Sequence, residues 1–305
     1  MQTILGANGV IANNIAKNLS GTKVRLVSRN PKKVNADDEL MAADLLNKSQ
    51  TLDAVKGSEI VYLTAGLPYK TKTWQTQWPA LMSNVIEACE KHNTKLVFFD
   101  NVYCYGRVKG WMTEETPVNP SSKKGEVRAK IAQMILEEVK KGNLTALIAR
   151  APDFYGPFTP ASFISVMIFE NYAKGSKAQV MISDACKHSL IFTPDAGKST
   201  ALLGNTPSAF NQVWHLPTDR NALTLKEIVQ LSAAAFGVKP DYVKLPRWAL
   251  RLAGLFIGVV GESVEMLYQY DSDYLFDSNK FDKAFDFKPT HYATGITEAV
   301  ASYRK

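Results

Sequence analysis

The stretch Gly6-Ala7-Asn8-Gly9-Val10-Ile11-Ala12 follows a short apolar segment, residues 2–5, and runs into a segment with helical character, residues 11–19. A strand, a glycine-rich turn and a helix in this order direct backbone N–H groups and the positive end of a helix dipole at one point. Such a turn suits the pyrophosphate of a dinucleotide, although two glycines also occur in ordinary strand–helix connections. Ala12 stands where a third glycine is usual. The residues after the turn are therefore needed to distinguish a dinucleotide-binding turn from an ordinary strand–helix connection.

The composition indicates a globular protein with free thiols. The chain has 305 residues, 46% of them hydrophobic, which is enough for one large α/β domain or a main domain with a smaller lobe. Its three cysteines and four histidines are widely spaced, a pattern that disfavours disulfides and metal sites. Because the glycine-rich turn begins at residue 6, we expect no signal peptide and a cytoplasmic location.

Charge and hydropathy limit the partners. The net charge is +7 and the pI about 9.1, yet the basic residues are scattered and no basic-aromatic module is present. This pattern favours a phosphate-bearing ligand over nucleic acid. The apolar run Leu252 to Val260 is too short to span a bilayer, and we expect a buried or lid-forming helix there. The predicted partner is a small-molecule substrate, with no nucleic acid and no membrane, and a homodimer remains open.

Strand-like and helix-like segments alternate through the first half of the chain. The apolar segments of strand length are Lys23–Ser28, Glu59–Ala65, Lys95–Asp100 and Leu144–Arg150. The segments with helical spacing are Asp38–Leu46, Gln50–Val55, Trp78–His92 and Gly125–Lys141. This alternation predicts an α/β fold with a doubly wound parallel sheet and helices on both faces.

The second half of the chain predicts a smaller lobe, because the alternation loosens after residue 157. Helices are expected at residues 161–173 and 224–236, and Thr224 with Glu227 forms a capping box for the second of them. We expect a nucleotide-binding domain over residues 1–150 and mainly a substrate lobe over residues 151–305. Segments near 183–220 are expected to return to the first domain.

The end of the second strand indicates which cofactor binds. An acid at this place binds the ribose hydroxyls of NAD, whereas an arginine accommodates the 2′-phosphate of NADP. The strand ends in Ser28-Arg29 without an acid. Because arginine binds phosphate in a bidentate fork, we expect NADP, with NAD less favoured, unless Arg29 is a solvated loop residue. Asp44-Leu45 suits a contact with adenine or is a surface acid.

Several further motifs, spread over nearly the whole chain, are similar to motifs of one superfamily. They are Thr64-Ala65-Gly66, Asn84, Tyr105-Gly106, the passage from Arg150 to Pro157 and the C-terminal stretch from Phe276 to Ile296. With the opening turn, they resemble the extended and atypical branches of the short-chain dehydrogenase/reductase superfamily, the NAD-dependent epimerase/dehydratase-like proteins. The resemblance implies a Rossmann-type domain with a smaller C-terminal substrate lobe.

The resemblance and the strand ends together give the candidate binding residues. Those expected at the cofactor are Gly6, Asn8, Gly9, Val10, Ile11, Ser28, Arg29, Asp44, Leu45, Thr64, Ala65, Gly66, Arg128 and Asp153. Those expected at the substrate, under the second lobe, are Leu67, Tyr69, Phe154 and Tyr155.

The catalytic pattern of the superfamily is replaced in this chain. That pattern is a Ser or Thr after the fifth strand and a Tyr-x-x-x-Lys pair on one helix face, in which the Tyr moves a proton and the Lys binds the ribose. Asn101, Lys124 and Arg128 occupy these three positions. We expect Asn101 to orient a carbonyl and Arg128 to hold the ribose. Lys124, one turn from the cation of Arg128, or Tyr103 would supply the proton. Alternatively, Lys124 is a solvated lysine at a helix start and Tyr103 is a packing aromatic.

Two functions from different classes follow. The first is an NADP(H)-dependent reductase, epimerase or dehydratase that acts on a small carbonyl or sugar-like substrate with a non-standard proton donor. The second is a non-catalytic NADP(H)-binding sensor or regulatory protein. The replaced Tyr favours the second function, whereas the passage from Arg150 to Pro157 and the full-size second lobe favour the first.

Overall fold

The chain divides into two compact units. The computed structural model describes residues 1–19 and 21–304. Unit 1 comprises Met1–Cys104, Lys123–Ala151 and Ala196–Leu216, and unit 2 comprises Tyr105–Ser122, Pro152–Asp195 and Pro217–Lys305. The expected domain boundaries stay a prediction, because a compact unit need not be a domain that folds alone.

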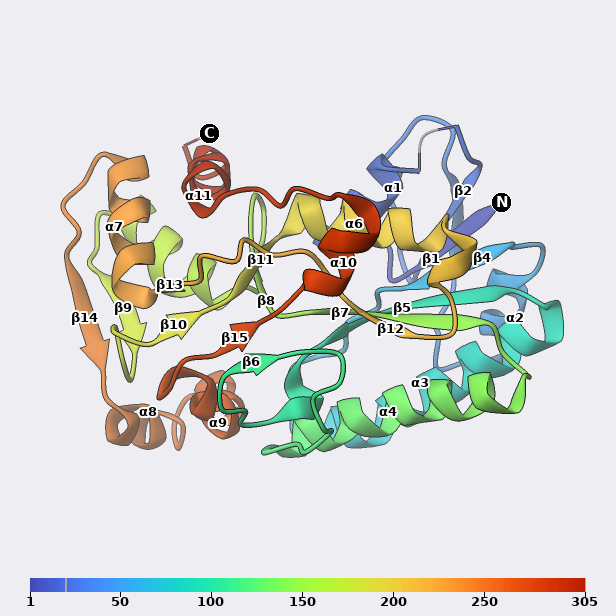
Figure 1. Cartoon of the computed structure of the whole chain (residues 1–305), viewed down its shortest axis with the longest axis horizontal. Coiled ribbons are helices and arrows are strands. Elements are labelled where there is room, and N and C mark those ends of the chain that lie inside the picture. The colour runs from blue at the N-terminus through green and yellow to red at the C-terminus, as the bar shows by residue number, and fades with distance from the viewer. Residues whose placement is uncertain (20, 305) are drawn as a thin grey trace. The chain divides into compact units, whose positions relative to one another are not determined.

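A parallel sheet of seven strands forms the centre of unit 1 (Figure 1). In spatial order the strands are β12 (Val213–His215), β7 (Ala146–Ala151), β5 (Lys95–Asn101), β4 (Ile60–Leu63), β1 (Gln2–Leu5), β2 (Val24–Ser28) and β3 (Glu39–Ala42). Every neighbouring pair is parallel, so the carboxyl ends of the strands lie at one edge. Strand β4 is buried along its whole length, as expected for a central strand covered on both faces. The predicted parallel sheet is confirmed.

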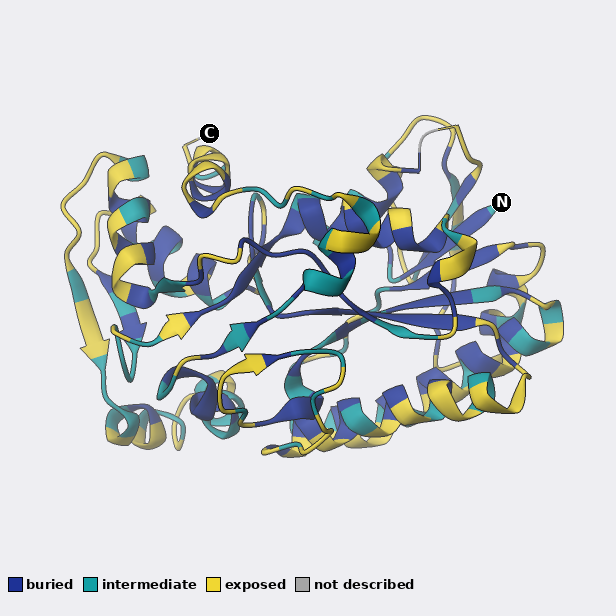
Figure 2. Ribbon diagram, viewed as in Figure 1, coloured by how far each residue is buried: buried dark blue, intermediate teal, exposed yellow. Residues whose placement is uncertain are grey.

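Helices cover both faces of this sheet (Figure 1). One face carries α1 (Val10–Lys17) and α6 (Thr193–Gly204), and the other carries α3 (Thr71–His92) and α4 (Lys123–Lys141). Helix α2 (Lys48–Val55) packs against α3. Figure 2 shows the central strands of this sheet buried and the outer sides of α3 and α4 exposed. The apolar side chains of α3, α4 and the strands form one core cluster, which holds the strand ends in fixed positions.

The expected helix at residues 38–46 is wrong, because this segment contains strand β3. Its residues pair in register with β2, Arg25 opposite Glu39, and these two side chains form an ion pair of 2.6 Å. The side chains of β3 alternate between half-buried and exposed, the pattern of an edge strand. Pairing with a preformed neighbour outweighs a short helical pattern.

Unit 2 consists of short strand pairs and helices. Its strands are β6 (Trp111–Met112), β8 (Asp153–Tyr155), β9 (Ala178–Met181), β10 (Lys187–His188), β11 (Leu190–Phe192), β13 (Leu223–Thr224), β14 (Tyr242–Leu245) and β15 (Leu275–Phe276). They pair as β8 with β11, β9 with β14, β10 with β13 and β6 with β15. Its helices are α5 (Glu170–Ala173), α7 (Leu225–Phe236), α8 (Arg247–Ala253), α9 (Gly258–Ser263), α10 (Asn279–Phe285) and α11 (Tyr292–Ala301). The predicted capping box of Thr224 and Glu227 is confirmed at the start of α7.

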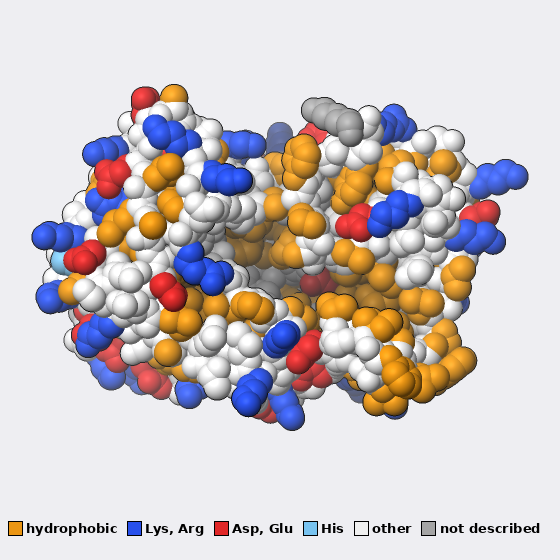
Figure 3. All heavy atoms as spheres, turned by 180° about the vertical axis from the view of Figure 1, so that it is seen from behind, with side chains coloured by type: hydrophobic (Ala, Val, Ile, Leu, Met, Phe, Trp, Pro, Cys, Tyr) orange, Lys and Arg blue, Asp and Glu red, His pale blue; other side chains and the backbone are white. Residues whose placement is uncertain are grey.

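The apolar run from Leu252 to Val260 is largely exposed, so the expectation of a buried helix is wrong, and that of a lid-forming helix stays a prediction. It lies at the junction of α8 and α9, where Leu255 is 77% and Phe256 is 83% exposed. Apolar side chains gather over this part of the molecule at the lower right of Figure 3. Among the described residues, no helix has both the length and the apolar content needed to cross a membrane. The expected cytoplasmic location stays a prediction.

Candidate functional site

The glycine-rich turn brings together two segments that sequence reasoning assigned to the cofactor. Gly6 has φ +109°, and a Cβ there would lie 2.4 Å from the backbone nitrogen of Ala65. Only glycine combines this left-handed backbone with so close an approach. The turn after β1 therefore lies directly against Thr64 and Ala65 at the end of β4.

The helix that follows the turn begins without a cap. Gly9 is the N-cap of α1, it offers no side chain, and the first turn of α1 contains no acidic residue. The N-terminus of α2 is capped by the Asn47 side chain and that of α7 by Thr224, whereas α3 begins, like α1, without a side-chain cap. An uncapped N-terminus leaves N–H donors for an anion. These donors, at the start of a helix that follows the glycine-rich turn, fit the pyrophosphate of a dinucleotide.

The segment after β2 is fixed by side chains on either side of it. Ser28 Oγ accepts a hydrogen bond from the Asn30 N–H at 3.3 Å. Asn8, with φ +77°, donates from Nδ2 to the Asn30 carbonyl at 2.7 Å and accepts the Lys32 N–H on Oδ1 at 2.9 Å. Arg29 is exposed, and its side chain makes no hydrogen bond or ion pair within the described part of the chain.

The loop after β3 is held by α3. Leu45 is buried, and its carbonyl accepts a hydrogen bond from Asn84 Nδ2 at 3.0 Å. The exposed Asp44 accepts the Leu46 N–H on Oδ1 at 3.0 Å, and its own N–H donates to the Gln50 side chain at 2.7 Å. The resemblance drew attention to Asn84, and the structure gives that residue a contact with the predicted adenine loop.

Arg128 lies in a buried ionic network. Its Nε donates to Asp100 Oδ1 at 2.7 Å, and Arg150 donates to the other oxygen of the same carboxylate at 3.2 Å. The Arg128 guanidinium also lies 4.8 Å from the centre of the Trp78 ring and 5.0 Å from that of Phe98. Sequence reasoning did not single out Asp100 as a site residue. The ribose contact expected of Arg128 stays a prediction.

Lys124 is fully buried, so its interpretation as a solvated lysine is wrong. Its Nζ donates to Thr71 Oγ1 at 2.8 Å and lies 4.5 Å from the centre of the Tyr69 ring. Tyr69 lies just before α3, and Thr71 is the first residue of α3. Sequence reasoning named Lys124 and Tyr69 but missed Thr71, for which no sequence signal was available. The three side chains form one cluster in unit 1.

Asn101 and Tyr103 lie close together where β5 ends. The Asn101 Oδ1 accepts the Tyr103 N–H at 3.1 Å, which closes a tight turn. The Tyr103 ring stacks on that of Trp74, with centroids 6.4 Å apart and planes at 21°. Trp74 in turn lies at 5.5 Å, edge to face, from Tyr69. Aromatic contacts thus connect Tyr103 with the cluster around Lys124.

Three further candidates, Asp153, Phe154 and Tyr155, belong to unit 2, whereas Leu67 is half-buried against the core of unit 1. Asp153 Oδ2 lies 2.9 Å from Nε2 of the buried His188, a partner that sequence reasoning missed. Tyr155 is only 1% exposed, and burial raises the pKa of its hydroxyl far above the usual range. It packs against Phe192 and Tyr292 in the core of this unit. Phe154 is half-buried.

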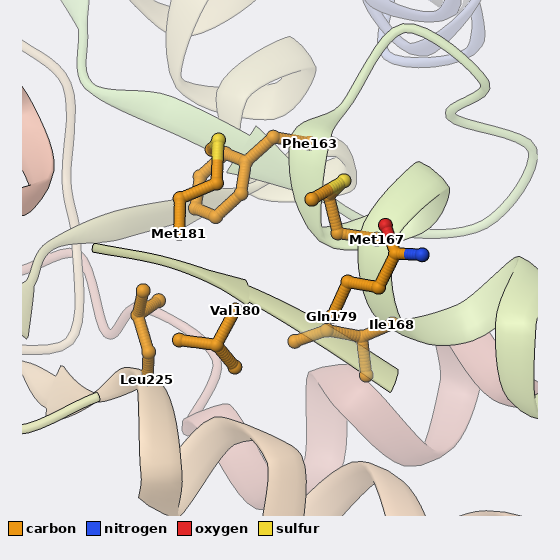
Figure 4. A pocket seen from close by; sticks show the side chains of 7 residues that line it. All are labelled: Phe163, Met167, Ile168, Gln179, Val180, Met181 and Leu225. Carbon is orange, nitrogen blue, oxygen red and sulfur yellow. The ribbon is translucent and has the colours of Figure 1, made fainter. Parts of the chain in front are cut away.

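Unit 2 also contains a small apolar pocket (Figure 4). It is lined by Phe163, Met167, Ile168, Gln179, Val180, Met181 and Leu225. Figure 4 labels these side chains, which come from the helical segment around residue 165, from β9 and from the start of α7. The Phe163 ring also lies edge to face with His188, at 5.4 Å between centroids. The space is too small to admit a water molecule, and six of the seven lining residues belong to the apolar core of this unit or pack against it.

One family model matches the chain, and solved structures share its fold. The model of the NAD dependent epimerase/dehydratase family matches residues 3–196. No curated protein matches the chain. Among solved structures, the chain is similar to the UDP-glucose 4-epimerase of Thermus thermophilus in complex with NAD. The identity is 18%, 100% of this chain and 99% of that chain are covered, and the TM-score is 0.81.

Two further solved structures give the same result. A UDP-glucuronic acid 4-epimerase from Bacillus cereus in complex with NAD has 14% identity and a TM-score of 0.81, with 100% of this chain and 99% of that chain covered. A double mutant of a dTDP-glucose 4,6-dehydratase from Streptomyces venezuelae with NAD bound has 15% identity and a TM-score of 0.80, with 100% and 97% covered. At these identities the likeness shows the fold, which is the predicted Rossmann-type α/β fold.

Proposed function

Because the chain belongs to the NAD-dependent epimerase/dehydratase family, we propose that it is an NADP(H)-dependent enzyme of this kind, acting on a small carbonyl or sugar-like substrate. The observation that carries the proposal is the turn at Gly6, where an uncapped helix follows a backbone that only glycine can form. A bound nicotinamide supplies hydride chemistry, and the protein has to bind, orient and protonate the substrate.

The preference for NADP rests on charge. Arg29 is exposed and unpaired within the described residues, and no acid stands at the end of β2. Unit 1 contains 20 Lys and Arg against 12 Asp and Glu, whereas unit 2 contains 16 against 17. The positive surplus of the chain is therefore in the unit with the glycine-rich turn. The solved relatives named above hold NAD, so the proposal of NADP rests on this chain's own residues.

We propose that either Lys124 or Tyr103 donates the proton to the substrate. Lys124 is a buried ammonium whose hydrogen-bond partner, Thr71, is half-exposed, so a proton can pass from Lys124 through this hydroxyl. Tyr103 carries its own hydroxyl and connects to the same cluster through Trp74. Asn101 would orient the carbonyl. The ionic network of Asp100 with Arg128 and Arg150 would hold α4 in a fixed position against β5.

The charge of unit 2 favours a small substrate without a diphosphate. This unit contains 16 Lys and Arg against 17 Asp and Glu, so it has no positive surplus to offset a diphosphate. A nucleoside diphosphate sugar carries two negative charges that such a surface does not compensate. We therefore expect small aldehydes or ketones to be better substrates than nucleotide sugars. A homodimer also stays a proposal.

The test is NADPH binding, followed by NADPH oxidation against a panel of aldehydes and ketones and by product analysis of nucleotide sugars incubated with NADP⁺, because an epimerase or dehydratase causes no net oxidation of its cofactor. The proposal expects binding and turnover of at least one small carbonyl compound. Tight binding without turnover across the panel would favour the second function, a non-catalytic NADP(H)-binding protein. That alternative is favoured by one observation, since Arg128, the residue in the Lys position of the family's pair, is bound to Asp100.

Replacing Lys124 with Met tests the proton donor. Met has a similar volume and no charge, so the buried site remains filled while the ammonium is lost. We expect kcat to fall by about 100-fold or more if Lys124 supplies the proton, the usual range for a general acid. Steady-state kinetics at several pH values give the measurement. Lys130→Met, an exposed lysine on the same helix, is the control. Tyr103→Phe tests the other donor, and both assignments fail if neither variant lowers turnover.

A further inference from the structure

Large apolar side chains gather in water where α8 meets α9, in unit 2. Each of them is at least half exposed, and together they form what we call the α8–α9 surface: Trp248, Leu252, Leu255, Phe256, Ile257 and Val259. They lie in the apolar area at the lower right of Figure 3. Single apolar residues are normal on a protein surface, whereas a gathering of this kind marks a place where something binds.

Close packing fixes the shape of the α8–α9 surface. Gly254 follows α8 and Gly261 lies in α9, and a Cβ on Gly254 would be only 2.9 Å from the Gly261 Cα. Because a side chain at either glycine would push the two helices apart, the glycines allow α8 and α9 to pack against each other. Leu250 on α8 is buried, so one side of this helix contacts the protein while Trp248 and Leu252 stand in water.

The charges beside this surface are positive. Residues 244–261 contain three cations and no acid. Two of the cations, Lys244 and Arg247, are bound to acids elsewhere in unit 2. The third, Arg251, is exposed and makes no hydrogen bond or ion pair with any residue that the structure describes. The α8–α9 surface therefore combines apolar side chains with one uncompensated guanidinium.

We propose that the α8–α9 surface docks the chain on an anionic lipid membrane. Its aromatic and aliphatic side chains enter the boundary between headgroups and acyl chains, as in proteins that lie on a bilayer without crossing it. Tryptophan favours this boundary, and arginine reaches the lipid phosphates while its aliphatic stem stays in apolar surroundings. The inference goes beyond the proposed function and depends on neither the cofactor nor the substrate.

The inference departs from the expectation that no membrane is a partner. That expectation rested on a run, Leu252 to Val260, that is too short to span a bilayer. A short length excludes spanning, but it does not prevent a segment from lying in the headgroup layer. The exposure of Leu255 and Phe256, which the sequence did not reveal, makes this second arrangement available.

A second copy of the chain is the competing occupant, and charge disfavours it. In a two-fold dimer the same surface lies on both sides, so each copy would bring its own Arg251 into one interface. The next acids along the chain, Glu262 and Glu265, are half-buried, and each already interacts with another group. An anionic lipid surface compensates the charge of Arg251, whereas a second copy repeats it.

The first test is sedimentation of the full chain with vesicles of phosphatidylcholine and phosphatidylserine in a ratio of about 2 to 1. The double variant Leu255→Ser/Phe256→Ser should lower the partition coefficient at least about tenfold, because two large apolar side chains no longer leave water. Both residues are more than three-quarters exposed, so the variant should fold, and its melting temperature checks this. Leu136→Ser/Leu202→Ser, exposed leucines on α4 and α6, is the matched control and should bind like the wild type.

The second test separates the charge from the apolar contact. Arg251→Gln should weaken binding to the mixed vesicles about fivefold, the effect of one cation at an anionic surface, and leave binding to pure phosphatidylcholine unchanged. Lys130→Gln, an exposed lysine on α4, is the control and should change neither.

Tryptophan fluorescence shows which side chain enters the lipid. Trp248 is 70% and Trp111 is 45% exposed, whereas the other three tryptophans are buried. Lipids with brominated acyl chains quench a tryptophan that inserts among them. We expect this quenching in the wild type and in Trp111→Phe, and its loss in Trp248→Phe.

Three outcomes would overturn the proposal. They are a wild-type protein that does not bind the mixed vesicles, equal binding by Leu255→Ser/Phe256→Ser, and quenching that persists in Trp248→Phe. Sedimentation velocity without lipid examines the second copy. A dimer that dissociates in Leu255→Ser/Phe256→Ser would assign the α8–α9 surface to self-association and would likewise overturn the proposal.

Discussion

Replacing Asp100 with Asn is expected to lower the free energy of unfolding by about 3–5 kcal/mol. The Asp100 carboxylate is completely buried and accepts hydrogen bonds from Arg128 on one oxygen and from Arg150 on the other. Both guanidinium groups are at least nine-tenths buried. With a neutral amide in place of the carboxylate, two buried positive charges would face each other without compensation.

Thermal and urea unfolding of the full chain measure this effect. The melting temperature should fall by roughly 10 °C, because each kcal/mol corresponds to a few degrees in a chain of this size. Asp53→Asn is the control, since Asp53 is exposed on α2, and it should shift the melting temperature by no more than about 2 °C. A loss in the Asp100 variant no larger than that of the control would mean that the network does not stabilise unit 1.

Arg29→Asp is expected to weaken NADPH binding by about 100-fold while changing NADH binding by less than about threefold. A bidentate guanidinium–phosphate contact contributes about 1.5–3 kcal/mol, and the new carboxylate adds repulsion against the phosphate. Arg29 is exposed and bonded to no other described side chain, so its replacement should leave the fold intact.

Isothermal titration with both cofactors gives the two dissociation constants. Lys130→Asp, a charge reversal of an exposed residue on α4, controls for the loss of overall positive charge. It should reduce the affinities for both cofactors slightly and by similar factors. Equal losses of NADPH and NADH in Arg29→Asp would remove the reason for choosing NADP.

The fold could be predicted from the sequence because local and global signals agree. Strand-length apolar segments alternate with helical ones, and a parallel sheet with helices on both faces is the arrangement that buries them. Strand β3 was missed because its residues are half exposed and gain their conformation from pairing with β2. The run after Leu252 was expected, from its hydrophobicity, to form a buried or a lid-forming helix, and the exposure of Leu255 and Phe256 contradicts the first of these.

The candidate site could be predicted only in part. The turn at Gly6 can be recognised in the sequence, because its backbone conformation requires glycine. The burial of Lys124 depends on Thr71 and Tyr69, which lie about 50 residues earlier in the chain. The same holds for the carboxylate of Asp100 beneath Arg128 and for the pairing of His188 with Asp153. Such contacts follow from tertiary packing, which spacing along one helix does not encode.

The central claim is that this chain binds NADP through a turn and a loop that its own residues build. The most direct test is the affinity of the unmodified protein for NADPH and NADH under the same buffer and salt conditions. The account predicts that NADPH binds at least about tenfold more tightly, the contribution of one bound phosphate. NADH binding that is equal or tighter would contradict it.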